Sequence, residues 1–382
     1  MKKTLIALAA LAATGAFAQV SVYGRLDAGY GVNTITKNDV DTKLNGVTSN
    51  NNATSLWGIQ GTEDLGAGMK ANFKLEQDVY TANGALGASG AGNGATTTSS
   101  FNRISKVGLS GGFGSVSFGR DYLPTFSLAA GTDVMGQTRF STIQLSTGAG
   151  YSTTDSLVMY STPVMSGFQV NVAYRNGDTS SNTGDNTDKV TNLTATYTNG
   201  PLMVGVGTGS AEVRTANGTA TAPAQRFATK VTYGLSDAIY GEKVSSNIVA
   251  ASYDFGTFKL LGNYITSKTT NAAAAASAST APSGVDVEAN ELNLGAVVPM
   301  GKVSLVAAVG TNTLKATGVD ARKGTDMSIG ADYNLSSKTV VYLRTGTVAK
   351  LESGRIPTSS TTSAANGEYK ATGTAIGIRT VF

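Results

Sequence analysis

The chain has 382 residues and contains neither histidine nor cysteine. The lack of cysteine excludes disulfides and thiolate metal sites, and the lack of histidine removes the usual general base of serine and cysteine hydrolases. Enzymes are therefore disfavoured, although carboxylate chemistry stays open. A formal net charge of +4 without a basic tract argues against a nucleic-acid partner.

The N-terminus has the layout of a secretory signal peptide. A basic start, Lys2 and Lys3, precedes a short apolar stretch and an A-x-A cleavage site that ends at Ala18. The apolar stretch is too short to cross a bilayer as a helix. We therefore predict that residues 1–18 are a signal peptide and that residues 19–382 form one mature domain.

Apolar and polar residues alternate along much of the remaining chain. Residues 168–175 place Phe, Val, Val and Tyr on one face and Gln, Asn and Arg on the other, and residues 291–298, 303–309 and 327–333 repeat the scheme. This period of two is typical of strands with two different faces. Each segment has about the length of a tilted transmembrane strand, roughly 9–11 residues. After the signal there is no apolar run long enough for a helical membrane span.

Short and long connections alternate strictly between these segments. The seven short turns are residues 61–68, 110–115, 162–167, 198–201, 254–257, 299–302 and 334–338. The eight long loops are residues 32–53, 81–100, 122–154, 176–187, 210–243, 268–285, 314–323 and 350–369. Together they separate sixteen strands, which predicts an all-β fold, a 16-stranded antiparallel transmembrane β-barrel.

One segment conflicts with this count. Residues 225–234 could form another strand, but an odd number of strands would break antiparallel closure in a single-chain bacterial barrel. We assign them to the fifth long loop, as a hairpin outside the membrane.

Two solvents explain the alternation. Side chains that face lipid must be apolar, whereas side chains that face a water-filled lumen can be polar. Closure pairs every backbone group, as hydrocarbon requires. Sixteen strands make a barrel too wide for its own side chains to fill, so we expect an aqueous bore that passes small hydrophilic solutes and ions passively.

Aromatic residues lie near the ends of the expected strands, where their amphipathic rings suit the two membrane interfaces. For any one of them, packing in the interior is the rival interpretation. The set comprises Tyr80, Tyr122, Tyr160, Tyr174, Tyr197, Tyr253, Tyr264, Tyr333 and Phe382.

Several stretches resemble the general, non-specific porins of Gram-negative outer membranes, of the β-proteobacterial type. Residues 20–27 resemble the first strand of that family, 61–71 its first periplasmic turn, and 101–121 its fourth and fifth strands. Residues 160–163 and 379–382 fit as well, so the likeness extends over the whole mature chain.

The resemblance implies a homotrimer in the outer membrane, surrounded by its lipid. It also implies that the third long loop, residues 122–154, folds into the bore and forms an eyelet. The terminal strand ends in Phe382, which by the same resemblance is a signal for the outer-membrane assembly machinery. In the family, basic residues on the wall face acidic residues on the loop.

The candidate pore residues follow from this resemblance and from strand parity. Arg103 matches a basic wall position of the family, and Arg120 directly precedes the third loop. Parity places four further cations and two acids toward the lumen, and the third loop contributes two acids. These are Arg25, Lys70, Lys74, Arg344, Glu76 and Asp27 on the wall, and Asp121 and Asp133 on the loop. The rival interpretation for each is a solvated lumen charge away from the eyelet.

Two features limit the expected selectivity. Strongly anion-selective members place further arginines where this chain has Leu56 and Thr153. Strict alternation also places Arg103 on the same side as Val107 and Leu109, so a bulge or a rim position must intervene. We therefore expect weak or modest anion preference.

Other functions remain as alternatives. A substrate-selective channel would need an aromatic ladder or a dense basic cluster in the bore, and an adhesin would act through its long loops. No cofactor is expected. Asp185 and Asp188 could hold Ca²⁺ loosely, but their spacing does not match an EF-hand and solvated loop acids are the simpler interpretation.

Overall fold

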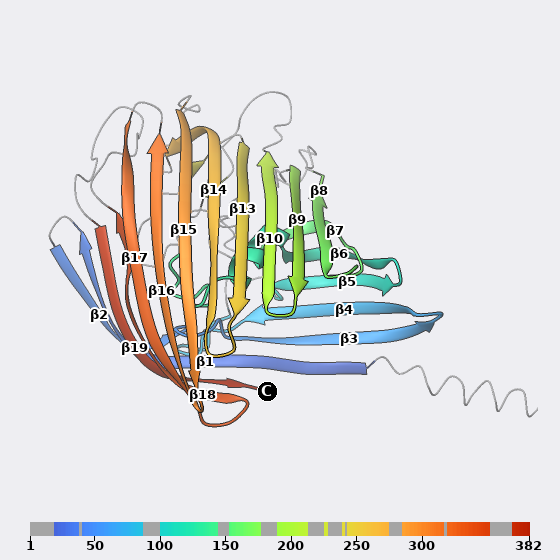
Figure 1. Ribbon diagram of the computed structural model, residues 1–382, viewed down its shortest axis with the longest axis horizontal. Helices are drawn as coiled ribbons and strands as arrows, with labels where there is room; N and C mark the ends of the chain where they lie inside the picture. The colour runs from blue at the N-terminus through green and yellow to red at the C-terminus, as the bar shows by residue number, and fades with distance from the viewer. Residues whose placement is uncertain are drawn as a thin grey trace, which may run out of the picture.

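The computed structural model is almost entirely β-sheet (Figure 1). Within the part of the chain that it describes, no helix is both long and apolar enough to cross a membrane. The signal peptide predicted for residues 1–18 lies outside that part. The described residues are 19–37, 40–86, 100–143, 153–176, 189–212, 225–227, 239–240, 243–274, 285–316, 319–351 and 369–382.

Antiparallel neighbours pair in chain order, and the last strand pairs with the first, so the sheet closes on itself. The barrel strands are β1 Gln19–Lys37, β2 Val40–Ser49, β3 Leu56–Gly66, β4 Met69–Asp78, β5 Ile104–Gly111, β6 Gly114–Tyr122, β7 Thr153–Ser161, β8 Phe168–Arg175, β9 Lys189–Asn199, β10 Leu202–Glu212, β13 Lys243–Asp254, β14 Lys259–Ala274, β15 Val285–Met300, β16 Val303–Ala316, β17 Val319–Asn334, β18 Thr339–Leu351 and β19 Tyr369–Val381.

The predicted barrel of sixteen strands is confirmed. β2 and β3 both pair with β1, β2 along its later half and β3 along its earlier half, so together they form one interrupted barrel strand. Two short strands, β11 Gln225–Phe227 and β12 Ile239–Tyr240, pair with each other, and β12 also pairs with Ala273 and Ala274 at the end of β14. The hairpin predicted for residues 225–234 cannot be compared with this pairing, because residues 228–234 lie outside the described part.

Two of the predicted long loops are shorter in the structure. The sequence predicts a first long loop at residues 32–53, but β1 and β2 pair continuously from Ala28 opposite Ser49 to Lys37 opposite Val40. The seventh loop likewise shrinks, because β16 runs to Ala316 and β17 starts at Val319. A pair of strands that extends beyond the membrane meets water on both faces, so its residues can be polar. A high content of Thr and Asn in such a segment therefore does not show that it is a loop.

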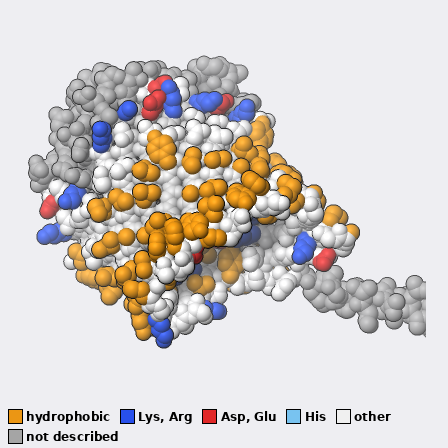
Figure 2. All heavy atoms as spheres, in the orientation of Figure 1, with side chains coloured by type: hydrophobic (Ala, Val, Ile, Leu, Met, Phe, Trp, Pro, Cys, Tyr) orange, Lys and Arg blue, Asp and Glu red, His pale blue; other side chains and the backbone are white. Residues whose placement is uncertain are grey.

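The alternation has the expected two faces. Large apolar side chains on one face of each strand are exposed, for example Val249 at 58% and Ile329 at 57%, while their neighbours Ala250 and Ser328 are buried. Figure 2 shows these apolar side chains as a band across the wall, with charged side chains gathered beside the long connections. The exposed apolar face is the one that lipid covers, and the opposite face lines the lumen.

The C-terminal residue closes the barrel. The backbone of Phe382 exchanges hydrogen bonds with Gly24 at 3.1 and 3.2 Å, and a Cβ at Gly24 would collide with the Phe382 ring. The ring therefore packs where only glycine leaves room.

Deletion of Phe382 should weaken this closure. We expect the unfolding free energy of barrels refolded in detergent to fall by roughly 1–2 kcal/mol. The loss comes from the two backbone hydrogen bonds with Gly24 and from part of the ring contact. Urea titration measures it. If export into the membrane falls much more than this loss explains, the assembly signal is supported; equal stability and equal export would contradict both roles.

Candidate functional site

The segment from Tyr122 to Ile143 packs against several strands of the barrel wall. It starts with helix α2, Pro124–Gly131, which contacts β8, β9, β10 and β13. Thr125 and Asn192 exchange two hydrogen bonds, of 2.9 and 2.8 Å. Buried apolar residues of the segment pack on inward-facing residues of β13, β14, β16 and β19; from the segment these are Leu128, Ala129, Met135, Phe140 and Ile143.

Wall glycines make room for this segment. A Cβ at Gly310 would lie 2.8 Å from the backbone oxygen of Thr142, one at Gly295 would lie 2.8 Å from Cγ1 of Val134, and one at Gly205 would lie 2.8 Å from a terminal methyl of Leu128. Glycine inside a strand often marks such a close approach of another segment.

Replacing these glycines by alanine should give a graded series. Gly310→Ala meets backbone and should displace the segment most, Gly295→Ala meets a branched side chain, and Gly205→Ala meets a methyl group that can rotate away. Because displacement from the wall pushes the segment into the lumen, single-channel conductance should fall in that order. The conductance is measured in planar bilayers. If all three variants conduct as well as the wild type, the segment does not restrict the current.

Arg103 lies at the centre of a charged cluster formed by residues of β4, β5 and β6. Its Nε is 2.6 Å from Oε1 of Glu76, and its Nη1 is 2.6 Å from Oδ1 of Asp78. The guanidinium also lies 5.3 Å from the ring centroid of Tyr122, in cation–π geometry. Lys74 completes the cluster, with its Nζ 3.3 Å from Oε2 of Glu76.

The conflict between Arg103 and strand parity has a local solution. β5 begins only at Ile104, and Phe101 has a φ of 59°, so Arg103 precedes the regular ladder. Its side chain can therefore reach Glu76 and Asp78, which point to the lumen, although Val107 and Leu109 of β5 face lipid. A rim position thus intervenes, as the sequence required.

Arg120 is turned inward by a bulge. The register of β6 against β7 shifts between Gly119 and Asp121, where Gly119 has a φ of 132°. The Arg120 side chain donates to the backbone oxygen of Asn102 at 2.6 Å and to Oγ1 of Thr153 at 2.7 Å, and it forms an ion pair with Asp155.

Lys106 of β5 and Asp121 of β6 form a further ion pair of the charged cluster. Lys106 Nζ lies 2.5 Å from Oδ2 of Asp121. Lys106 also stands directly opposite Lys74 on the neighbouring strand. The side chains of Lys74 and Lys106 are 30% and 31% exposed, compared with 13% for Arg103, so these lysines are the more open cations.

The remaining basic candidates divide by position. Arg25 donates to the backbone oxygen of Thr54 at 2.9 Å and lies near enough to Arg103 to interact with it electrostatically. Lys70 is exposed beside the first short turn. Arg344 is buried and paired with Asp332 at 2.8 Å, so it is held in the wall and is not open to the bore.

Two of the acidic candidates stabilise the fold through buried or local hydrogen bonds. Asp27 is fully buried and accepts hydrogen bonds from Tyr342 Oη at 2.6 Å and from the backbone nitrogens of Asn52 and Ala53 at 2.7 Å. The carboxylate of Asp133 accepts from Met135, Gln137 and Ser141 within its own segment. Neither carboxylate is therefore a solvent-exposed charge in the lumen, as strand parity predicted for Asp27 and loop position predicted for Asp133.

Sequence reasoning missed other members of the cluster. Lys106 could have been found by parity, because it alternates with the lipid-facing Val107. Asp78 could have been found in the same way, because it shares the parity of Lys74 and Glu76, whereas Asp155 gave no signal beyond its charge. Tyr122, assigned to the interfacial aromatic set, instead lies inside, with its ring stacked at 5.1 Å on Phe126.

No cluster of three or more acidic residues suited to a metal ion occurs among the described residues. Asp185 and Asp188, considered for Ca²⁺, lie outside them.

A closed barrel of sixteen tilted strands, with an apolar outer band and a charged inner wall, is the architecture of outer-membrane channels. The sequence profile of Gram-negative porins matches residues 4–350. The chain belongs to the Gram-negative porin family. It is 30% identical to outer membrane porin protein 32 of Delftia acidovorans over 354 residues, which cover 90% of this chain and 88% of that protein.

A second relative agrees with this porin assignment, and two solved structures share the fold. An outer membrane porin protein of Bordetella pertussis is 34% identical over 53% of this chain and 58% of its own length. The solved anion-selective porin from Comamonas acidovorans shares the fold, with a TM-score of 0.67 and 23% identity over 96% of this chain and 100% of that one. The trimer form of OmpT from Vibrio cholerae has a TM-score of 0.60 and 16% identity, covering 96% and 99% of the two chains.

The porin is therefore a passive diffusion channel of the Gram-negative outer membrane, which it crosses many times.

Proposed function

We propose that this porin passes small hydrophilic solutes and ions through a constriction between the charged wall of β4, β5 and β6 and the segment 122–143. The proposal is supported by the packing of this segment on buried residues of β13, β14, β16 and β19, and by the contact of Tyr122, at its start, with Arg103 of the charged cluster. A charged constriction sets a size limit by its width and biases ion choice by its field.

The charge balance of the cluster supports weak anion preference. Lys74, Arg103, Lys106 and Arg120 each have an acidic partner, and the partners are Glu76, Asp78, Asp121 and Asp155. Arg25 instead donates to a backbone oxygen, which leaves an excess of one positive charge. Ion pairs cancel most of the field at a distance, so the preference should be small.

The reversal potential in a planar bilayer under a KCl gradient tests this proposal. We expect a potential displaced modestly toward the chloride equilibrium value, and more so at low salt, where screening is weaker. A firm preference for cations would overturn the anion preference, and absence of any conductance by the folded protein would overturn the channel proposal.

We also propose a homotrimer, which the trimer form of a porin with the same fold supports. Single insertions should then raise the current in three equal sublevels that close independently under voltage. A folded, conducting protein that gives only one level would contradict it.

A further inference from the structure

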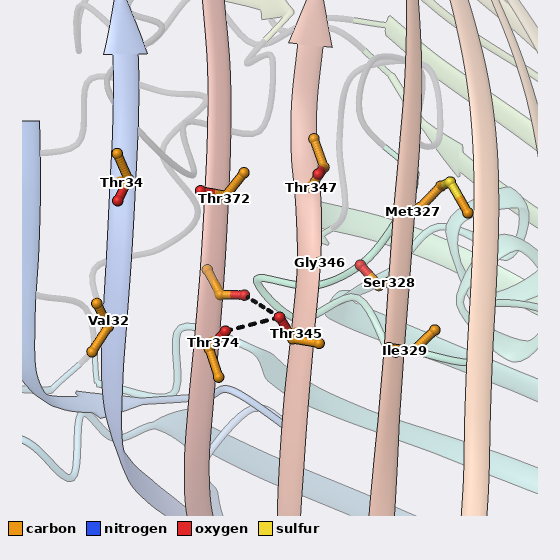
Figure 3. A pocket seen from close by; sticks show the side chains of 11 residues that line it. Val32, Thr34, Met327, Ser328, Ile329, Thr345, Gly346, Thr347, Thr372 and Thr374 are labelled. Carbon is orange, nitrogen blue, oxygen red and sulfur yellow. Dashed lines mark hydrogen bonds between the residues drawn. The ribbon is translucent and has the colours of Figure 1, made fainter. Parts of the chain in front are cut away.

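Two arginines lie near each other on the lumen face, where the first and last strands of the barrel pair. Asp27 of β1 stands directly opposite Arg379 of β19, and Arg25 lies two residues before Asp27, so the two arginines form a diagonal pair. Residues in such pairs are about 7–8 Å apart, within reach of long side chains. Val32 and Thr374 of the same two strands lie on the outer face, beside a groove lined by threonines (Figure 3), and alternation from them places both arginines inside.

The break between β2 and β3 holds both guanidinium groups. Nε of Arg25 donates to the backbone oxygen of Thr54 at 2.9 Å, and Nη1 of Arg379 donates to Oδ1 of Asn52 at 2.8 Å. Asn52 is in turn fixed by its backbone N–H, which donates to the Asp27 carboxylate at 2.7 Å. The same short segment therefore orients both groups, through neutral acceptors.

Most donors of the two guanidinium groups stay unused. Neither arginine forms an ion pair within the described part of the chain, and each makes one hydrogen bond there. Both Nη groups of Arg25 and Nη2 of Arg379 thus have no acceptor among the described residues, and Nε of Arg379 is buried without one. Because both side chains are only partly buried, a small solute in the bore can reach their free Nη groups.

The acids nearby do not neutralise this pair of arginines. Asp27 is fully buried and is engaged by three neutral donors, so it offsets about one of the two positive charges at a distance. Glu76 also attracts Arg25 electrostatically, but it is paired with Arg103. Arg103 and Arg379 both act on Arg25 as like charges. The lumen therefore has an excess of positive charge here that no contact with a carboxylate cancels.

We propose that Arg25 and Arg379 bind the phosphate group of a solute in the bore. The site lies in the diffusion channel proposed above, on which this inference rests, and it holds a passing phosphate for a short time. A tetrahedral phosphate presents more acceptor oxygens than a carboxylate and more charge than chloride. Guanidinium groups hold such oxygens through pairs of N–H donors, and three free Nη groups on two guanidinium planes suit phosphate best.

Equilibrium dialysis of radiolabelled inorganic phosphate against the detergent-solubilised porin tests the site without any current. At pH 8 and low salt, the wild type should retain one phosphate per chain. Arg25→Gln and Arg379→Gln should each lower the affinity about tenfold, because each removes charge-assisted hydrogen bonds. Arg25→Lys should give an intermediate affinity, since lysine keeps the charge but cannot form a paired contact.

A matched control removes one positive charge elsewhere. Lys338→Gln lies on an exposed short turn just before β18 and should leave phosphate retention unchanged. Wild-type retention by both arginine-to-glutamine variants would overturn the proposal. It would also be wrong if Lys74→Gln with Lys106→Gln abolished retention while Arg25→Gln did not, because the more open lysines would then bind the phosphate.

Single-channel recording separates this inference from the proposed function. Phosphate added to a KCl solution should reversibly reduce the current through the wild type, and should reduce it much less in Arg25→Gln. An equal effect of glucose 6-phosphate would assign the site to the phosphate group of any small solute, whereas an effect of inorganic phosphate alone would assign it to the free ion. A conducting channel that retains no phosphate contradicts this inference alone, and a folded protein that retains phosphate but conducts no ions contradicts the proposed channel alone.

Discussion

Arg103→Glu should turn the weak anion preference of the pore into a cation preference. The substitution changes the local charge by two units and places three carboxylates together, because Glu76 and Asp78 lose their shared partner. An ion that passes about 5 Å away in water gains or loses about 0.8 kcal/mol per unit charge. Two units shift a cation and an anion by about 1.7 kcal/mol each in opposite directions, so the permeability ratio changes by roughly a hundredfold without screening and by less as salt rises.

The measurement is the reversal potential under a KCl gradient, with Lys70→Glu as the matched control. Lys70 undergoes the same change of charge, but it is exposed beside a short turn, away from the cluster. We expect Lys70→Glu to shift the potential much less. Equal shifts in both variants would show that the bore as a whole sets selectivity, and no shift in Arg103→Glu would place Arg103 away from the ion path.

The barrel could be predicted because its physics is local and repeated. Each strand must alternate between lipid and water, so period two in segments such as 168–175 and 327–333 predicts both strand positions and faces. Loop boundaries were less predictable. A ladder such as β1 with β2 can extend into water with polar residues on both faces, and no sequence rule marks where the membrane ends and the ladder continues.

The sequence indicated the residues of the candidate site, but it did not indicate which of them pair with one another. Arg103 and Arg120 both reach their acidic partners through exceptions to alternation, because Arg103 precedes β5 and Arg120 follows a bulge at Gly119. Such irregularities depend on contacts between strands that are distant in sequence. The role of Asp27 was equally hidden, because its hydrogen-bond partner Tyr342 is 315 residues away.

Asp27→Ala should cost the barrel more stability than the other lumen substitutions. The carboxylate is fully buried and accepts three short hydrogen bonds, from Tyr342, Asn52 and Ala53. Alanine leaves all three donors without an acceptor, and each unmet buried group costs about 1–3 kcal/mol. We expect a loss of roughly 3–5 kcal/mol in the unfolding free energy.

The effect should extend to neighbouring residues near the junction of the first and last strands. Asn52, which Asp27 holds through its backbone, also donates to Asp332 at 2.8 Å and accepts from Arg379 at 2.8 Å. Loss of Asp27 should therefore free the break between β2 and β3, together with the partners of Arg344 and Arg379. The mobility of that break should appear as added current noise in single-channel records.

Urea titration followed by Trp57 fluorescence measures the loss, since Trp57 is the single tryptophan and lies in β3 just after the break. Asp27→Asn is the matched control. Its amide keeps one acceptor oxygen in nearly the same shape, so it should lose about half as much stability. If Asp27→Ala unfolds at the same urea concentration as the wild type, the carboxylate is not what holds residues 50–55 against the wall, and the seam must be stabilised by the strand ladders alone.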